Sequence, residues 1–134
     1  MEKVVIKTHK TKEVVDITDQ LNSVIKNYPR KKGFCHLFLT HTTAALSTAY
    51  SDPKWELDVI DAFEVEIPKM TTIRSKYEHN HHIAHLPTHI TASYIGQSLS
   101  IPYKSGKLIL GNFQRVVLIE LNGPRKREII MEIQ

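Results

Sequence analysis

Histidine is concentrated in one short stretch of the sequence. Residues 77–90 read YEHNHHIAHLPTHI and hold five of the chain's eight histidines, namely His79, His81, His82, His85 and His89. Imidazole titrates near neutral pH, and it is a preferred ligand of borderline metals such as Zn²⁺. The stretch is therefore either a metal or acid–base site, or a solvated loop that is rich in histidine and binds no metal.

The spacing of these histidines gives partial support to a metal site. His81 and His85 are four residues apart, as are His85 and His89, and on a helix each pair would share a face. Pro87 lies between His85 and His89, so one uninterrupted helix through all three is not expected. We predict a loop over residues 77–86 and a short helical segment that begins at Pro87.

A further ligand need not be local in sequence, and His41 in LTHTTAA is a candidate. Zn²⁺ at catalytic sites takes three protein ligands and a water molecule. The hydroxyls of Thr40, Thr42 and Thr43 could hold a phosphate or orient the imidazole ring. Cys35 is not expected to be a nucleophile served by His41, because six residues of extended strand separate them by about 20 Å.

Length and composition predict one ordinary globular domain over residues 1–134. Hydrophobic residues make up 41% of the chain and charged residues 24%, and no apolar run approaches the ~20 residues of a membrane span. The first residues, MEKVVIKTHK, do not resemble a signal peptide. One cysteine cannot form an internal disulfide, which fits a reducing compartment. We expect a cytoplasmic protein that does not cross a membrane.

The chain is basic, with a formal net charge of +4. Basic residues cluster in KNYPRKK (26–32) and in GPRKRE (123–128). Such clusters bind phosphates or nucleic acid, or they are solvated loops. They do not show the aromatic interleaving that a base-stacking platform needs. We therefore expect a small phosphorylated molecule, rather than nucleic acid, as the partner.

Alternation of apolar and polar residues predicts a sheet of many short strands. The strand-like runs cover residues 3–9, 13–17, 33–43, 98–103, 107–111, 115–121 and 128–133. Helical patterns cover 18–28, where Thr18 is the expected N-cap, and 51–63, where Asp52 is the expected N-cap. Short connections between the last four runs favour antiparallel neighbours over crossovers. The sum is an α+β fold with a mostly antiparallel sheet.

Two stretches in the last third of the chain constrain that sheet. KSGKL (104–108) resembles the end of a phosphate-binding P-loop, but Ile101 occupies the position of the required earlier glycine. We predict instead a hairpin turn with Gly106 at positive φ. RVVLIEL (115–121) is apolar at nearly every position, which indicates a strand covered on both faces or one that forms a subunit contact.

Five motifs occur in an order that is typical of one family. They are HTTAAL (41–46), YEHN (77–80), HITASYIGQSLSIP (89–102), SGKLILGNFQ (105–114) and ELNGPRKR (120–127). In these motifs the chain resembles the YjbQ-like family, also called the secondary thiamine-phosphate synthase family. The resemblance extends over nearly the whole chain, from about residue 3 to residue 133.

The resemblance implies a sandwich-like layer of strands packed with two or three helices, and a homotrimer with sites at its subunit interfaces. It also implies a bound metal ion, and the matching positions for its ligands are His41, His79 and His89. Three imidazole ligands favour Zn²⁺ over Mg²⁺ as that divalent metal. The expected catalytic residues are His41, His89 and Asp52. The expected substrate-binding residues are Thr42, Thr43, Lys107, Gln114 and Arg125.

The sequence departs from the family pattern after the first motif. The family often has an Asn–Glu pair there, whereas this chain has Ala49 and Tyr50, so Asp52 and Asp58 are the nearby carboxylates that remain. The family's Gly-Thr-Trp-Gln is GNFQ (111–114) in this chain.

The activity that the resemblance implies is thiamine-phosphate synthesis, in which a pyrimidine pyrophosphate is joined to a thiazole phosphate and pyrophosphate is released. Both substrates are anionic, so a metal, Lys107 or Arg125 would have to neutralise the leaving group. Two alternatives stay open. A three-histidine zinc site suits a metal-dependent hydrolase of a small phosphorylated metabolite. A trimer that holds a metal or a phosphate without turnover is the second.

Overall fold

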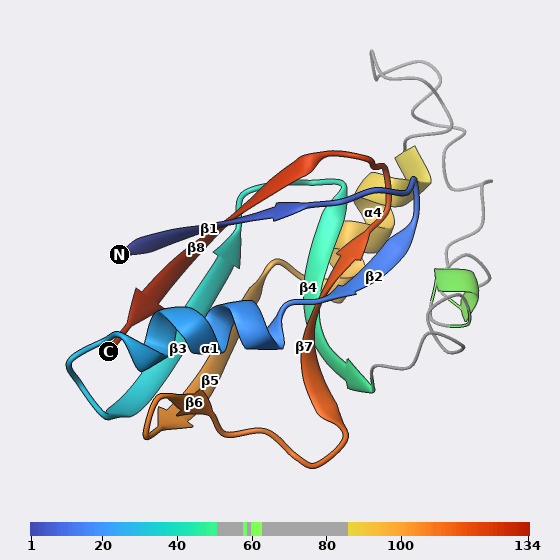
Figure 1. Ribbon diagram of the computed structural model, residues 1–134. Coiled ribbons are helices and arrows are strands. Elements are labelled where there is room, and N and C mark those ends of the chain that lie inside the picture. Colours follow the sequence, from blue (N-terminus) through green and yellow to red (C-terminus); the bar gives the residue numbers. More distant parts are fainter. Residues whose placement is uncertain (51–57, 59, 63–85) are drawn as a thin grey trace.

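The computed structural model describes residues 1–50, 58, 60–62 and 86–134, which form two antiparallel sheets with helices at their sides (Figure 1). The elements are β1 (Glu2–Lys7), β2 (Glu13–Asp16), α1 (Thr18–Lys26), β3 (Lys32–Leu39), β4 (Ala44–Tyr50), α4 (Leu86–Ile95), β5 (Ser98–Lys104), β6 (Lys107–Leu108), β7 (Gln114–Glu120) and β8 (Lys126–Ile133). The larger sheet has the strand order β1–β8–β3–β5–β6, and the smaller has the order β2–β7–β4. The predicted α+β class is confirmed.

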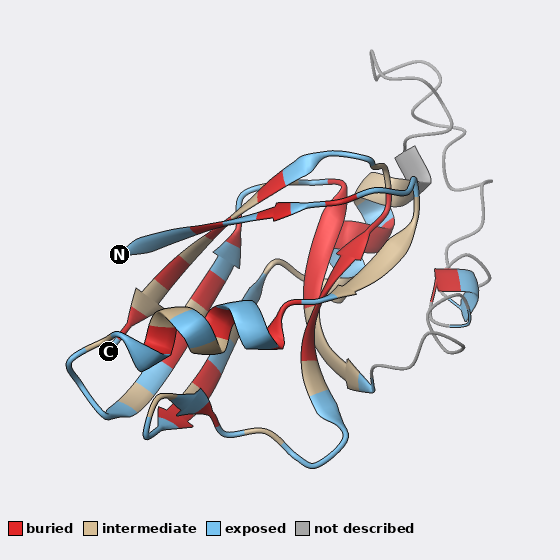
Figure 2. Ribbon diagram, in the orientation of Figure 1, coloured by how far each residue is buried: buried red, intermediate tan, exposed pale blue. Residues whose placement is uncertain are grey.

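The five-stranded sheet has a buried face and an exposed face, because its strands alternate in burial (Figure 2). On β3, Cys35 and Leu37 point into the core, while Phe34 and Phe38 are about half exposed on the opposite face. Burial raises the pKa of the Cys35 thiol to about 12. Cys35 is therefore a small core residue, as the sequence predicted, and not a thiolate nucleophile.

Strand β7 is buried on both faces. Val116 and Leu118 pack into the main core between the two sheets. Val117 and Ile119 pack into a second core, which includes Ala92 of α4. Of the two readings of this apolar run, coverage on both faces within one chain is therefore confirmed.

The start of α1 differs from the prediction. Ile17 occupies the N-cap position and makes no side-chain capping bond, so the N-cap prediction for Thr18 is wrong. The Thr18 amide donates instead to Asp16 Oδ1 at 3.0 Å. The Thr18 hydroxyl is buried and accepts a hydrogen bond from the Val116 amide at 2.8 Å. Its side chain therefore joins the helix to β7 rather than capping the helix.

The predictions for the connections in the last third of the chain are confirmed in one case and wrong in the others. The hairpin between β5 and β6 is confirmed, with Lys104 paired to Lys107 and with Gly106 at φ +80°. The expectation that the last strands are sequential neighbours is wrong for β6 and β7 and for β7 and β8, because β7 lies in the smaller sheet and both β6 and β8 lie in the larger one. Residues 109–113 carry the chain from the larger sheet into the smaller one, and residues 121–125 carry it back.

The strand predicted over residues 33–43 ends early, at Leu39, and a second strand follows at β4, which was not predicted. Ala44, Ala45 and Leu46 are all buried, so β4 shows no alternation at its start. Residues 40–43 form the connection between β3 and β4. His41 therefore lies in a turn rather than on the strand.

The helix expected from Pro87 is confirmed as α4, which begins one residue earlier, at Leu86. Asp58 and residues 60–62 of the expected helix over 51–63 are helical, and its other residues lie outside the described part of the chain. The predicted loop lies outside it as well, up to residue 85. Within the described part, neither α1 nor α4 is long and apolar enough to cross a membrane.

Candidate functional site

A buried ion pair joins the two sheets at the end of β7. Arg127 on the inner face of β8 and Glu120 at the end of β7 are 1% and 0% exposed. Arg127 Nη2 lies 2.5 Å from Glu120 Oε2, and Arg127 Nε donates to both carboxylate oxygens at 3.0 and 3.1 Å. The same Nη2 donates to the carbonyl and the hydroxyl of Thr43. The reading of residues 123–128 as only a solvated loop is therefore wrong for Arg127.

Glu120 also positions the segment that leads from β7 to β8. Its Oε2 accepts from the amides of Leu121 and Asn122 at 3.1 and 3.4 Å. Its Oε1 accepts from the hydroxyl of Thr8 at 2.7 Å, and that hydroxyl accepts from the Arg125 amide at 2.8 Å. The buried Glu120 carboxylate thus fixes the backbone of residues 121–125, which includes Arg125.

The His41 ring is fixed by the main chain of β8. The Glu128 amide donates a hydrogen bond to His41 Nε2 at 2.9 Å. A neutral imidazole that accepts at one nitrogen carries its proton on the other, so this contact selects the tautomer protonated at Nδ1. Burial, and next the charge of Arg127, lower the pKa of His41. At neutral pH His41 therefore offers an N–H donor rather than a free lone pair.

His89 reaches the same turn from α4. Its Nδ1 lies 3.1 Å from the hydroxyl of Thr42. The contact joins residues that are 47 positions apart in sequence. It is made possible because α4 packs on the smaller sheet, beside the connection that leads into β4.

These side chains line an open cleft of about 680 Å³. Its lining consists of Thr40, His41, Thr42, Thr43, His89, Asn122, Arg125, Lys126 and Arg127. No carboxylate is among these residues, as far as the described part of the chain shows. The charge of Arg127 is balanced by Glu120, which leaves the exposed Arg125 and Lys126 as the net positive charge. The size suits a small molecule, and the charge suits an anion.

The structure brings five of the predicted site residues together. His41, His89, Thr42, Thr43 and Arg125 all line the cleft. They come from the β3–β4 connection, from α4 and from the segment before β8. The motifs that suggested them are thus adjacent in space as well as ordered in sequence.

Two predicted residues lie elsewhere in the chain. Lys107 is in the β5–β6 hairpin. Gln114 begins β7 at the end opposite Glu120; its amide nitrogen donates to Thr48 Oγ1 at 3.0 Å and its oxygen accepts from the Gly111 amide at 3.1 Å. Neither lines the cleft of its own chain. Asp52 and His79 lie outside the described residues.

The described residues do not by themselves make a metal site. Among them, no group of three or more His, Cys, Asp or Glu side chains is placed to hold a metal ion. His41 does not fit as a ligand, because its Nε2 faces the Glu128 amide and its Nδ1 carries the proton. Coordination by His41 would therefore require the loss of that hydrogen bond.

Asn122, Lys126 and Arg127 line the cleft although they were not among the predicted site residues. A signal for Arg127 is present in KREIIMEI, where Arg127 shares the inward parity of Ile129 and Met131. A charge at such a position predicts a buried partner. The matching signal is Glu120, a carboxylate within the most apolar run of the chain.

Comparison with known proteins gives one consistent result. The sequence profile of the family described as "UPF0047 protein YjbQ-like" matches residues 2–134. A UPF0047 protein of Archaeoglobus fulgidus is 31% identical over 127 residues, covering 95% of each chain. The UPF0047 protein MJ1081 of Methanocaldococcus jannaschii is 34% identical over 129 residues, covering 96% of this chain and 89% of its own.

Solved structures agree with the fold. An uncharacterised conserved protein of the YjbQ/UPF0047 family from Clostridium acetobutylicum is 27% identical, with a TM-score of 0.84 over the whole of both chains. A YbjQ-like protein of unknown function from Sulfolobus solfataricus is also 27% identical, with a TM-score of 0.85, covering 98% of this chain and 94% of its own.

Proposed function

Because this chain belongs to the UPF0047 YjbQ-like family, we propose that its cleft binds the phosphate or pyrophosphate group of a small phosphorylated metabolite. The observation that carries the proposal is the lining itself. Two exposed cations, Arg125 and Lys126, stand beside threonine hydroxyls, and no described lining residue is acidic. Such a set neutralises an anion and donates hydrogen bonds to its oxygens.

Arg125 is held in a suitable position for this role. Its Nε donates to the Asn122 carbonyl at 2.9 Å, so the guanidinium is tethered at one nitrogen. The two terminal nitrogens remain to form a fork toward phosphate oxygens. His41 also lines the cleft, and its Nδ1–H would add a neutral donor.

The reaction that we propose is the one implied by family resemblance. The ring nitrogen of a thiazole phosphate attacks the methylene carbon of a pyrimidine pyrophosphate, a C–N bond forms, and the C–O bond to pyrophosphate breaks. The attacking nitrogen carries no proton, so the step needs no general base. It needs stabilisation of the departing pyrophosphate, which Arg125 and Lys126 would provide.

A divalent metal remains part of the proposal in a limited form. When bound, it would neutralise the negative charge on pyrophosphate oxygens. Mg²⁺ that arrives with pyrophosphate needs few protein ligands, which is compatible with the donors present. A zinc centre would need His89 together with His79, and it is the condition for the alternative function, a metal-dependent phosphate hydrolase.

We also propose that the protein is a homotrimer with the site at its subunit interface. In support, the tips of β4 and β7 carry exposed apolar side chains, Tyr50 and Phe113, whose rings lie 6.1 Å apart. If this tip packs on a neighbouring subunit, it brings Gln114 toward that subunit's cleft. Light scattering with size-exclusion chromatography tests this, because Phe113→Asp should then yield monomers.

The function is tested by pyrophosphate binding and pyrophosphate release. Arg125→Gln should weaken calorimetric binding of pyrophosphate by roughly 10- to 100-fold, since a charged hydrogen bond contributes roughly 1.5–3 kcal/mol. Lys3→Gln, which removes one positive charge from an exposed residue of β1 that does not line the cleft, is the matched control. Equal affinity of the two variants would exclude the cleft as the site.

The candidate activities differ in their products. The synthase reaction predicts pyrophosphate release only when both substrates are present. A hydrolase predicts phosphate release from one substrate, abolished by a chelator and restored by Zn²⁺. A protein that only binds predicts thermal stabilisation by pyrophosphate with no product from either substrate.

A further inference from the structure

Three lysines form a row at the end of the five-stranded sheet that lies away from the cleft. In the strand register Lys32 pairs with Lys104, and Lys104 pairs with Lys107. Paired residues point to the same face, with about 5 Å between their Cβ atoms. Three lysine side chains from β3, β5 and β6 thus leave the same face of the sheet at one level. No stretch of the sequence contains this row.

The last residue of α1 and the turn that follows it add three more basic residues to this end, namely Lys26, Arg30 and Lys31. The Ser105 amide of the hairpin donates to the Lys31 carbonyl at 2.7 Å, and the Tyr103 hydroxyl donates to the Arg30 carbonyl at 3.4 Å. The space beside Gly106 is bounded by Lys26, whose Cα lies 3.2 Å from where a side chain would begin. The basic segment over 26–32 therefore packs against the hairpin that carries Lys104 and Lys107.

The six basic residues at this end have no acidic partner among the described residues. All six are exposed, and none takes part in a salt bridge with another residue in the described ranges. Like charges placed directly opposite on neighbouring strands destabilise a sheet. An arrangement that is unfavourable for the isolated chain becomes favourable when it neutralises an extended anion.

An aromatic surface begins directly beside the lysine row. Phe34 follows Lys32 on the same face of β3 and is 51% exposed. Its ring stacks with that of His36, with centroids 6.3 Å apart and an interplanar angle of 17°. Aromatic faces of this kind stack on nucleobases without requiring a particular sequence. A lipid headgroup or free phosphate would make no use of this feature.

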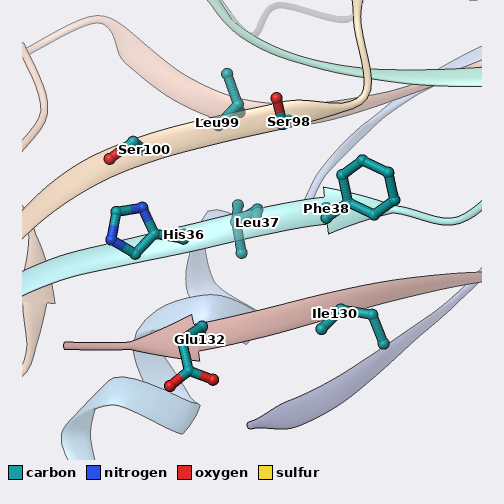
Figure 3. A pocket seen from close by; sticks show the side chains of 8 residues that line it. All are labelled: His36, Leu37, Phe38, Ser98, Leu99, Ser100, Ile130 and Glu132. Carbon is teal, nitrogen blue, oxygen red and sulfur yellow. The ribbon is translucent and has the colours of Figure 1, made fainter.

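A shallow pocket of about 350 Å³ continues the surface beyond His36. Figure 3 shows that His36, Ser100 and Glu132 reach it from three adjacent strands, with Phe38 at its far side. Glu132 lies on β8, on the opposite side of β3 from Lys104. Its carboxylate lies 3.7 Å from the N-terminal ammonium of Met1, so the positive charge on that side of β3 is already paired. An anionic chain is therefore drawn to the lysines of β3, β5 and β6.

We propose that this face binds a short segment of single-stranded nucleic acid. The phosphates lie over the row of Lys32, Lys104 and Lys107, and a base stacks on Phe34. The surface is separate from the cleft, because β3 runs about 23 Å from Lys32 to Leu39, and Thr40, the next residue, is the first that lines the cleft. The strand register thus supplies the adjacency of cations and an aromatic ring that the linear sequence did not show.

The test is fluorescence anisotropy of a labelled eight-nucleotide single strand with the full chain. Three phosphate contacts predict a salt slope of about −2, so raising salt from 50 to 200 mM should weaken binding roughly 20-fold. The variant with Lys32, Lys104 and Lys107 all changed to Gln should bind about tenfold or more weakly at low salt and lose most of the slope. Lys126→Gln, a cation of the cleft, should bind as wild type does.

Stacking is tested by Phe34→Leu, which keeps an apolar side chain and removes the aromatic face. It should weaken binding by roughly fivefold or more, with the salt slope unchanged. Thermal unfolding checks the fold, and the lysine variant should unfold no lower than wild type because it relieves repulsion.

Four outcomes would overturn the proposal. They are equal oligonucleotide binding by wild type and the lysine variant, full affinity in Phe34→Leu, equally tight binding of a duplex of the same length, and binding only to vesicles that contain phosphatidylserine. The last would assign the face to an anionic membrane surface instead.

Discussion

The buried pair of Glu120 and Arg127 gives the most demanding prediction for stability. Glu120→Gln keeps the size of the side chain but removes the charge that faces Arg127, whose guanidinium is buried with no other carboxylate in contact among the described residues. It also replaces one acceptor oxygen with an N–H₂ group that faces the donors of Arg127 and nearby amides. Removing one partner of a buried pair costs about 3–5 kcal/mol.

That cost can be converted into a melting temperature. For 134 residues the entropy of unfolding is roughly 0.28 kcal/mol per kelvin, so the variant should melt about 11–18 °C below wild type. Urea unfolding followed by circular dichroism gives the free energy directly. The double variant Glu120→Leu/Arg127→Met should cost much less than the two single changes together, because an apolar pair leaves no unpaired charge in the core.

The reasoning would be refuted if Glu120→Gln lost less than about 1 kcal/mol, or if the double variant cost the sum of both single variants. In either case the pair would not act as a coupled, desolvated unit. The hydrogen bonds from Arg127 to Thr43 would then also contribute little to fixing Thr43 in the cleft.

Three further predictions concern single positions. The pKa of His41 is lowered in the folded state, so protonation of this ring favours the unfolded chain. The contribution of neutral His41 to stability is present above the unfolded pKa of about 6.5 and is lost as the pH falls through the folded pKa. His41→Gln, which can still accept the hydrogen bond from the Glu128 amide, should lose less free energy of unfolding between pH 7 and pH 5 than wild type does. Cys35, with its pKa raised to about 12, should resist iodoacetamide at pH 8 in the folded protein and react on unfolding, as mass spectrometry would show; rapid labelling of the native state would contradict its burial. Gly123→Ala should destabilise by about 2 kcal/mol or more in chemical denaturation, because the new Cβ would lie 2.3 Å from the Lys10 carbonyl oxygen; an unchanged midpoint would show that this approach relaxes freely.

The alternation of apolar and polar residues predicted those strands that have one solvent-exposed face and one buried face. Residues 33–39 and 128–133 alternate, and both runs are strands of the five-stranded sheet. Strand β4 was missed because Ala44, Ala45 and Leu46 face buried surroundings in succession and alanine has a weak strand preference. Tertiary packing, rather than local preference, makes this segment a strand.

Sheet assignment depended on information that short connections do not carry. The five residues between β7 and β8 are short enough for a hairpin, yet they carry the chain into the other sheet. The ion pair of Glu120 and Arg127 stabilises this connection. It joins the inner faces of two different sheets, so it does not appear in the alternation of residues along either strand. The candidate site was likewise predicted only in part. Residues 41–43 and Arg125 were predicted from sequence motifs, whereas the tautomer of His41 depends on a tertiary contact with the Glu128 amide of β8.

The position of β7 has a consequence for how the molecule unfolds. The strand is hydrogen-bonded to β2 on one side and β4 on the other, and its alternate side chains belong to two different cores. Displacement of β7 would therefore disrupt the packing of both cores at the same time. The chain should therefore melt as one cooperative unit, and the β7 amides should exchange with deuterium only at the rate of global unfolding.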